Sequence, residues 1–199
     1  MRDSTEFHAL HQARLSPDGC YLLDAFNPPP VGAGSPALLV MTDLSRMPAA
    51  TIDAHALLSE AHHSMLIRGV RMLLVVDLEH RVIGLVTTTD IFGEKPVLVA
   101  HRMQCKLLDL RVLDVMVPMD HLETVPIEEV RRARVGDIVA TLRAHGRAHA
   151  LVLGSDAQGR QALAGIFSAS QIARQLGVPI QTYEVARTFA EIEAALAGS

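Results

Sequence analysis

The chain has 199 residues, a length that suits one large domain or two small ones that share a core. Hydrophobic residues make up 49% of it, aromatic residues only 4%, and Trp is absent, so the core must consist of aliphatic side chains and Met. The formal net charge of −4 argues against nucleic acid as the main partner, because nucleic-acid-binding domains are usually basic.

The sequence lacks the features typical of export or membrane insertion. Residues 1–12, MRDSTEFHALHQ, have no apolar centre of the kind found in signal peptides. No run reaches the roughly 18 apolar residues of a membrane-spanning helix. Cys20 and Cys105 are far apart and in no CxxC motif, which favours two reduced thiols over a disulfide. We therefore expect a soluble cytoplasmic protein.

Pro and Gly are concentrated in NPPPVGAGSP, residues 27–36, which predicts a linker. After it, the order strand, helix, strand, strand, helix occurs twice. The first repeat has two short apolar segments, a helix closed by Gly, a hairpin and a second helix (39–43, 49–53, 54–69, 71–87 and from 88). The second repeat has the same order of segments (113–118, 122–130, 135–146, 148–168 and 168–177). Such a repeat indicates paired structural units that share a core.

These signals divide the chain into four parts. They are an N-terminal extension with the linker, a first repeat, a second repeat and a C-terminal helix (1–35, 36–108, 109–178 and 179–199). The C-terminal helix is predicted from Val185, Phe189, Ile192 and Leu196, which recur at helical spacing. We expect it to pack on the main body or on a partner chain.

Two stretches of the repeats carry a resemblance to a known family. RMLLVVDLEHRVIGLVTTTDI, residues 71–91, resembles the second half of a cystathionine-β-synthase (CBS) domain, with an apolar strand ending in Asp, a turn, and Gly-apolar-apolar-Thr-x-x-Asp. HALVLGSDAQGRQALAGIFSASQI, residues 149–172, resembles the same half in altered form. VMTD and DVMVP resemble the lead-in before each unit, so the resemblance covers roughly residues 36–178.

The resemblance implies a tandem CBS pair, or Bateman module. Its expected fold is α/β, with two pseudo-symmetric repeats packed sheet to sheet. Such modules often form homodimers. Many bind adenine nucleotides or adenosyl compounds in clefts between the repeats and regulate another protein. We therefore expect no required cofactor, a small-molecule nucleotide as a ligand, and a regulated protein partner.

The stretch GLVTTTD, residues 84–90, places polar side chains where a strand gives way to a helix. The first turn of a helix has free backbone N–H groups and partial positive charge, which favour phosphate. The hydroxyl of Thr87 can add a hydrogen bond to phosphate or ribose. The carboxylate of Asp90 can accept two hydrogen bonds, which suits a ribose diol. The resemblance assigns the same roles to both residues.

A second interpretation of this stretch needs no ligand. Ser, Thr and Asp are favoured at helix starts, where a capping side chain contributes about 1 kcal/mol. Thr87 or Thr88 would then cap the helix, and Asp90 would interact with its dipole. The residues alone leave both interpretations open.

The rest of the ligand site is assigned by position in the repeat. We expect Thr51 and Leu74 to form the slot for the base, although many family members have Pro at the position of Leu74. In the second repeat, Ser168 keeps the hydroxyl, but Gln171 replaces the acid. Because Gln lacks the charge that strengthens hydrogen bonds to a carboxylate, we expect the better adenosine site to be anchored by the first repeat. Two alternatives stay open for the second cleft, which is either empty or binds something else.

Charged residues suggest further contacts. VRRARVGD, residues 130–137, is typical of a solvated face, but Arg132 or Arg134 is a candidate phosphate ligand, as is Arg71. We expect no metal site, because the adjacent His62 and His63 point about 100° apart on a helix and cannot easily share an ion.

The sequence contains no local motif of a nucleophilic triad, P-loop or GxGxxG loop. We therefore expect a regulatory module that senses an adenosine-containing ligand, such as AMP, ADP, ATP or an S-adenosyl compound, and not an enzyme. Two alternatives remain: a dimeric CBS adaptor that binds no ligand, favoured by Gln171, and an enzyme with an unrecognised site.

Overall fold

The computed structural model describes residues 11–14, 16–20 and 30–177. The chain divides into two units, Met1–Pro30 and Val31–Ser199, and the fold described below belongs to the second unit. The predicted C-terminal helix, 179–199, lies outside the described residues, as does most of the N-terminal extension. Among the described helices, none combines the length and the apolar character needed to cross a membrane.

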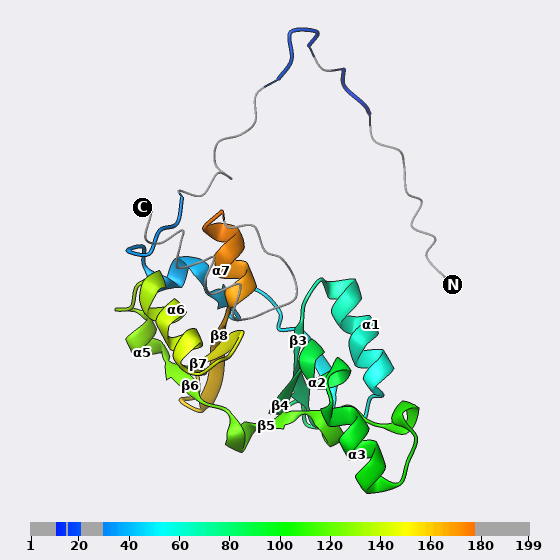
Figure 1. Cartoon of the computed structure of the whole chain (residues 1–199). Helices are drawn as coiled ribbons and strands as arrows, with labels where there is room; N and C mark the ends of the chain where they lie inside the picture. The colour runs from blue at the N-terminus through cyan, green and yellow to red at the C-terminus, as the bar shows by residue number, and fades with distance from the viewer. Residues whose placement is uncertain (1–10, 15, 21–29, 178–199) are drawn as a thin grey trace, which may run out of the picture. The chain divides into compact units, whose positions relative to one another are not determined.

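Two four-stranded sheets with flanking helices form this unit (Figure 1). The strand orders are β2-β3-β4-β5 and β1-β8-β7-β6. The strands are β1 (Thr42–Asp43), β2 (Thr51–Asp53), β3 (Met72–Val76), β4 (Val82–Thr87), β5 (Val117–Pro118), β6 (Thr124–Pro126), β7 (His149–Ser155) and β8 (Gln161–Ser168). The helices are α1 (Leu58–Arg68), α2 (Thr88–Phe92), α3 (Lys95–Met103), α4 (Val112–Val115), α5 (Ile127–Val130), α6 (Val135–Ala144) and α7 (Ala169–Gln175), with short 3-10 turns η2 (Ala37–Val40), η3 (Leu107–Asp109) and η4 (Met119–His121).

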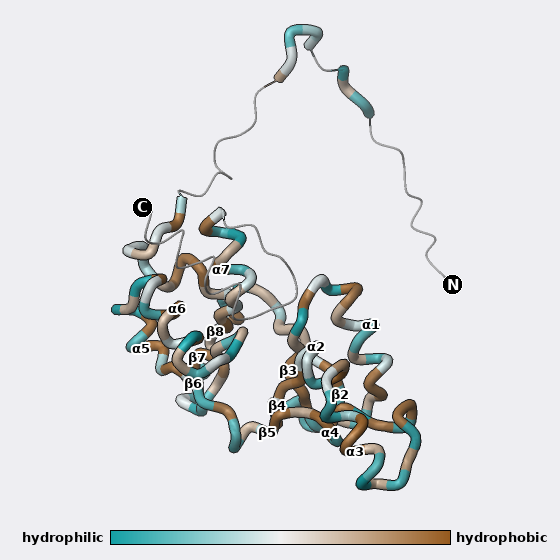
Figure 2. The backbone as a smooth tube through the Cα atoms, viewed as in Figure 1, coloured by the Kyte–Doolittle hydropathy of each residue, from teal (hydrophilic) through white to brown (hydrophobic). Residues whose placement is uncertain are grey.

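The central strands are covered on both faces, which explains their continuous apolar sequence. On β3, Met72 and Leu74 belong to a buried cluster that includes Leu151 of the other sheet. Their neighbours Leu73 and Val75 pack in the core formed with the helices of the first repeat. Figure 2 shows the hydrophobic course of β3 and β4 between these layers. The expected α/β fold, with two pseudo-symmetric repeats packed sheet to sheet, is confirmed.

The two lead-in strands exchange sheets between the repeats. β1, at the start of the first repeat, pairs antiparallel with β8 of the second, with Thr42 opposite Ile166. β5, at the start of the second repeat, pairs antiparallel with β4 of the first, with Val117 opposite Leu85. Each sheet is therefore completed by a strand from the other half of the sequence, and the two halves are tied together.

Some helix boundaries differ from the sequence-based expectation. The first helix was expected to start at residue 54 but begins at Leu58, because the carboxylate of Asp53 accepts the backbone N–H of His55 at 2.7 Å and makes a turn there. The lead-in segment 39–43 begins in the 3-10 turn η2, which ends at Val40, and only Thr42 and Asp43 form a strand, β1. Helix α3 was not predicted, and it starts with a Pro in its first turn, where the missing N–H costs nothing.

Candidate functional site

Two cavities lie between the repeats. The first, here called the Asp90 cleft, has a volume of about 540 Å³. It is lined by the β4–α2 junction on one side and by residues 146–149 on the other. The second, here called the Gln171 cleft, has a volume of about 690 Å³ and is lined by the β8–α7 junction and by residues 69–72. Both volumes are typical of small-molecule sites.

Asp90 is held by a capping box at the start of α2. Its Oδ2 accepts the backbone N–H of Thr87 at 2.9 Å and the Thr87 hydroxyl at 2.7 Å. The Thr87 oxygen in turn accepts the backbone N–H of Asp90 at 3.3 Å. The capping role that the sequence left open is therefore present. It also fixes the carboxylate at the cleft wall, where Oδ1 lies 3.9 Å from Nζ of Lys95, beyond hydrogen-bond distance.

The opposite wall of the Asp90 cleft comes from the second repeat. Leu122, Glu123 and Arg147 line it. The Glu123 carboxylate lies 3.0 Å from Nδ1 of His145 and 4.0 Å from a guanidinium nitrogen of Arg147. The sequence analysis did not single out these residues, because it took the slot for the base, Thr51 and Leu74, from the first repeat alone. The pseudo-symmetry of the repeats is the signal that would have found them, since a cleft between two related units takes one wall from each.

The residues expected to hold the base lie elsewhere. Thr51 pairs with Leu74 across β2 and β3. Leu74 is only 2% exposed, because it packs in the cluster between the two sheets. Neither residue lines the Asp90 cleft, whereas Leu151, the second repeat's equivalent of Leu74, does.

The three arginines proposed as phosphate ligands are separated by the structure. Arg71 lines both clefts. Arg132 and Arg134 line neither of them. Arg134 precedes α6, where its backbone N–H is bound by the carboxylate of Asp137 at 2.8 Å. Of the three, only Arg71 is positioned to meet a ligand between the repeats.

The wall shared by the two clefts contains His149. Burial lowers the pKa of its imidazole to about 4, and the positive charge of Arg71 adds to this effect. His149 is therefore neutral at pH 7 and can donate or accept a hydrogen bond. Met72, its equivalent in the first repeat, lines both clefts as well.

The pKa of His149 makes stability depend on pH. Below pH 6.5 the unfolded chain gains a proton at this residue, whereas the native state gains one only near pH 4. The contribution of His149 to the free energy of unfolding is therefore full above pH 6.5 and is lost as the pH falls from 6.5 to 4. His149→Gln should flatten the decline of the melting temperature over this range, measured at pH 7, 6 and 5. The exposed His63→Gln is the control and should keep the wild-type decline; equal slopes for all three proteins would contradict the assignment.

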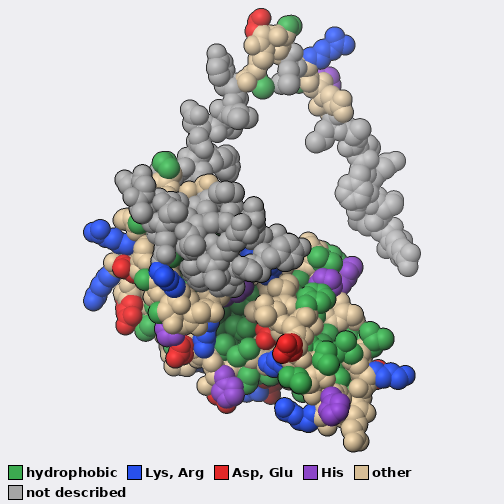
Figure 3. All heavy atoms as spheres, in the orientation of Figure 1, with side chains coloured by type: hydrophobic (Ala, Val, Ile, Leu, Met, Phe, Trp, Pro, Cys, Tyr) green, Lys and Arg blue, Asp and Glu red, His purple; other side chains and the backbone are tan. Residues whose placement is uncertain are grey.

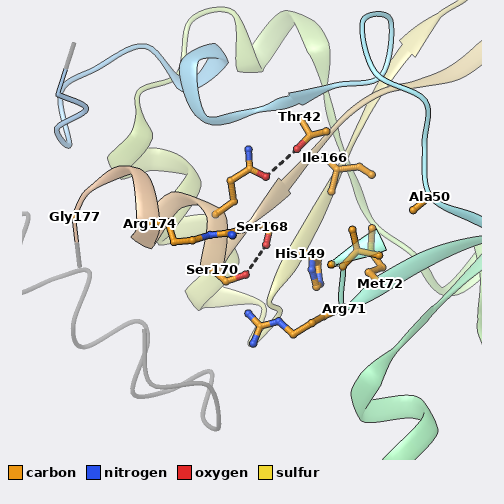
Figure 4. Close-up of a pocket in the computed structure, with 13 residues that line it drawn as sticks. Thr42, Ala50, Arg71, Met72, His149, Ile166, Ser168, Ser170, Arg174 and Gly177 are labelled. Carbon is orange, nitrogen blue, oxygen red and sulfur yellow. Dashed lines mark hydrogen bonds between the residues drawn. The ribbon is translucent and has the colours of Figure 1, made fainter. Parts of the chain in front are cut away.

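The Gln171 cleft has a different polar lining (Figure 4). Oε1 of Gln171 accepts the hydroxyl of Thr42 at 3.0 Å, and the hydroxyls of Ser168 and Ser170 are 3.0 Å apart. Ser168, which the sequence placed among the ligand-binding residues, therefore lies in this cleft and not with Asp90.

The comparisons with known proteins agree with this architecture. Residues 40–96 match the CBS domain family. A comparison with curated proteins gives no match. An uncharacterized conserved protein from Pyrococcus horikoshii is structurally similar, with 20% identity, a TM-score of 0.54, and coverage of 76% of this chain and 99% of its own.

A second similar structure is the CBS-pair protein CBSX2 from Arabidopsis thaliana, with 20% identity, a TM-score of 0.47, and coverage of 71% of this chain and 93% of its own. A structure of CBSX2 in complex with AMP gives 19% identity, a TM-score of 0.48, and coverage of 71% and 95%. At these identities the likeness concerns the fold alone.

Proposed function

We propose that the chain is a tandem CBS-domain regulatory module whose Asp90 cleft binds an adenosine-containing ligand. The ligand class comprises AMP, ADP, ATP and S-adenosyl compounds, which share a ribose diol and a purine. Binding would change a surface that a protein partner recognises. The observation that carries this proposal is a carboxylate fixed at the wall of a cleft between the two repeats.

The capping box supports diol recognition because it orients Asp90 before a ligand arrives. Oδ2 is held by Thr87, and Oδ1 is left at the cleft wall without a hydrogen bond from the described residues. A diol whose two hydroxyls donate to the two lone pairs of Oδ1 would form charge-assisted hydrogen bonds. Because the carboxylate is already ordered, little conformational entropy is lost on binding.

The other walls suit the remaining parts of such a ligand. Arg71 and Arg147 can pair with phosphate oxygens through two N–H groups each. Leu85, Val117 and Leu122 give the cleft an apolar lining on which a purine can rest. Glu123 carries a negative charge at the same wall and would favour a monophosphate or a positively charged adenosyl compound over a long polyphosphate.

The location of the cleft provides a mechanism for signalling. Asp90 belongs to the first repeat and Arg147 to the second, so one bound molecule contacts both. A ligand shifts the arrangement of the repeats only to the extent that it binds one arrangement more tightly than another. The exchanged strands β1 and β5 connect the repeats and would transmit that shift.

Thermal unfolding with a panel of adenosine ligands tests the proposal. A ligand at about 100 times its dissociation constant adds roughly 2.7 kcal/mol of stability. For a domain of this size, each kcal/mol moves the midpoint by about 2 to 4 °C. We expect one compound to raise the midpoint by several degrees and to be recovered unchanged. The absence of a shift with any compound at millimolar concentration would favour the ligand-free adaptor, and consumption of the nucleotide would favour an enzyme.

We also propose that the module forms a homodimer through the helices of the first repeat. Leu66, Ile67, Phe92, Val97 and Leu98, on α1, α2 and α3, are each at least 61% exposed. Figure 3 shows hydrophobic side chains gathered over this part of the surface. Burying them against a second copy would remove apolar area from water. Light scattering at micromolar concentration should give the mass of a dimer, and Phe92→Glu with Leu98→Glu should give a monomer; a monomeric wild type would exclude this interface.

A further inference from the structure

The chain leaves the second repeat at the rim of the Gln171 cleft. Gly177, which follows α7, lines this cleft together with Arg174 (Figure 4). The first repeat differs at the equivalent place, because α3 follows α2 there and no residue of α3 lines the Asp90 cleft. The course of the chain after the last helix of each repeat therefore distinguishes the two clefts.

The residues around Gly177 end the helix. Gly177 has a φ of 72°, in the left-handed region that glycine favours at helix ends, and its N–H donates to the carbonyl of Arg174 at 3.2 Å. The sequence continues with Val178 and Pro179. Proline has no N–H for a further helical turn and disfavours a helical conformation at the residue before it. The sequence therefore predicts that an extended stretch starts at the rim of the cleft.

The lining of the Gln171 cleft suits apolar side chains. Four apolar residues contribute to it, namely Ala50, Val70, Met72 and Ile166, and the volume of the cleft is about 690 Å³. Val178 and Ile180 would lie on the same side of an extended stretch. Their burial against this lining would remove apolar area from water, which is favourable by roughly 25 cal/mol per Å².

The polar groups of the cleft also suit this segment. Oε1 of Gln171 already accepts the hydroxyl of Thr42 at 3.0 Å. Arg71 and Arg174 line the cleft, and no carboxylate lies among the described residues that do so. The sequence that follows Gly177 supplies a carboxylate at Glu184, which can pair with a guanidinium group.

The segment can reach across the cleft. Six extended residues span at most about 20 Å, which exceeds the breadth of a cavity of about 690 Å³. A short tether also gives the attached segment an effective concentration on the order of millimolar. A weak intrinsic affinity is therefore enough to keep the cleft filled.

We infer that residues 178–184 bind in the Gln171 cleft, so that the second cleft between the repeats is filled by the protein's own C-terminal segment. Val178 and Ile180 pack on the apolar lining, and Glu184 complements the charge of the arginines. Of the two clefts, the Asp90 cleft is then the one that stays open to a small molecule. This inference goes beyond the proposed function and does not depend on any ligand of the Asp90 cleft.

A single tryptophan tests whether the segment is buried, because the chain contains no Trp. In the full chain, Tyr183→Trp should give the short-wavelength emission of a buried indole and slow quenching by acrylamide. Adding Ile180→Asp should raise the quenching constant severalfold, since an unpaired carboxylate is costly in an apolar cleft. Ile192→Asp is the matched control, the same exchange farther along the segment, and should leave the quenching constant unchanged.

Methyl NMR of the same proteins locates the contact. Ile180→Asp should shift the signals of Val70 and Ile166, which line the Gln171 cleft alone of the two. The signals of Leu85 and Leu122, which line the Asp90 cleft alone, should stay in place. The inference is overturned if the indole of the Tyr183→Trp protein is freely quenched. It is also overturned if Ile180→Asp leaves Val70 and Ile166 unshifted, or shifts all four residues equally.

Discussion

Gly84→Ala should lower the free energy of unfolding by roughly 2 to 3 kcal/mol, because the added methyl group would overlap the backbone of the exchanged strand β5. A Cβ at this position would lie 2.5 Å from the carbonyl oxygen of Val117 and 3.3 Å from Cα of Pro118. Backbone atoms of a paired strand cannot move aside without breaking the β4–β5 pairing. The substitution therefore acts on the strand exchange that joins the repeats.

Gly165→Ala is the matched comparison. Gly165 occupies the equivalent position on β8, beside β1, but its added Cβ would meet the side chain of Met41 at 2.5 to 3.0 Å. Methionine is flexible and can turn away, so the cost should be smaller. Thermal unfolding should show that the melting temperature falls by roughly 4 to 12 °C for Gly84→Ala and by clearly less for Gly165→Ala. An equal fall in melting temperature for both variants, or a greater fall for Gly165→Ala, would contradict the close approach of β5 to Gly84.

Asp90→Ala should weaken binding of an adenosine ligand by roughly 10- to 100-fold, as expected when a hydrogen-bonded charged group is removed from a binding site. The same substitution also removes the capping box of α2, which costs about 1 kcal/mol of stability. Loss of binding alone would therefore not separate the two roles of this carboxylate.

Asp137→Ala separates the helix-capping role from the ligand-binding role. Asp137 occupies the same position in the first turn of α6 and accepts the backbone N–H of Arg134 at 2.8 Å, but it lines neither cleft. Both variants should lose similar stability in the absence of ligand. Only Asp90→Ala should lose the ligand-induced rise in melting temperature, and titration of each variant measures the affinity directly. Retention of full affinity in Asp90→Ala would restrict this residue to helix capping.

The local architecture was predictable because its signals are local. The apolar run 71–77 and the segment 81–87 predicted the hairpin that the structure forms as β3 and β4. GLVTTTD predicted the strand-to-helix junction, where Thr87 and Asp90 now form a capping box. In each case the pattern of apolar side chains, turn residues and caps determines the conformation of neighbouring residues.

The strand exchange could not be predicted in the same way. A two-residue strand such as β1 carries almost no periodic signal, and its pairing with β8 joins residues more than 120 positions apart. The division of the ligand site between the two repeats follows from this exchange of strands. Thr51 and Leu74 share a repeat with Asp90, but the cleft takes its second wall, with Leu122 and Arg147, from the other repeat.

The most direct test of the proposed adenosine site is a methyl NMR titration of the wild-type chain with AMP. Leu85 lies on the first repeat's side of the Asp90 cleft, while Val117 and Leu122 come from the second half of the sequence. Saturable shifts of all three methyl signals at one common dissociation constant are expected, with Leu113, which lines neither cleft, unaffected. If AMP, ADP, ATP and an S-adenosyl compound all fail to produce a saturable shift at these three residues, whatever they do elsewhere, the Asp90 cleft is not an adenosine site.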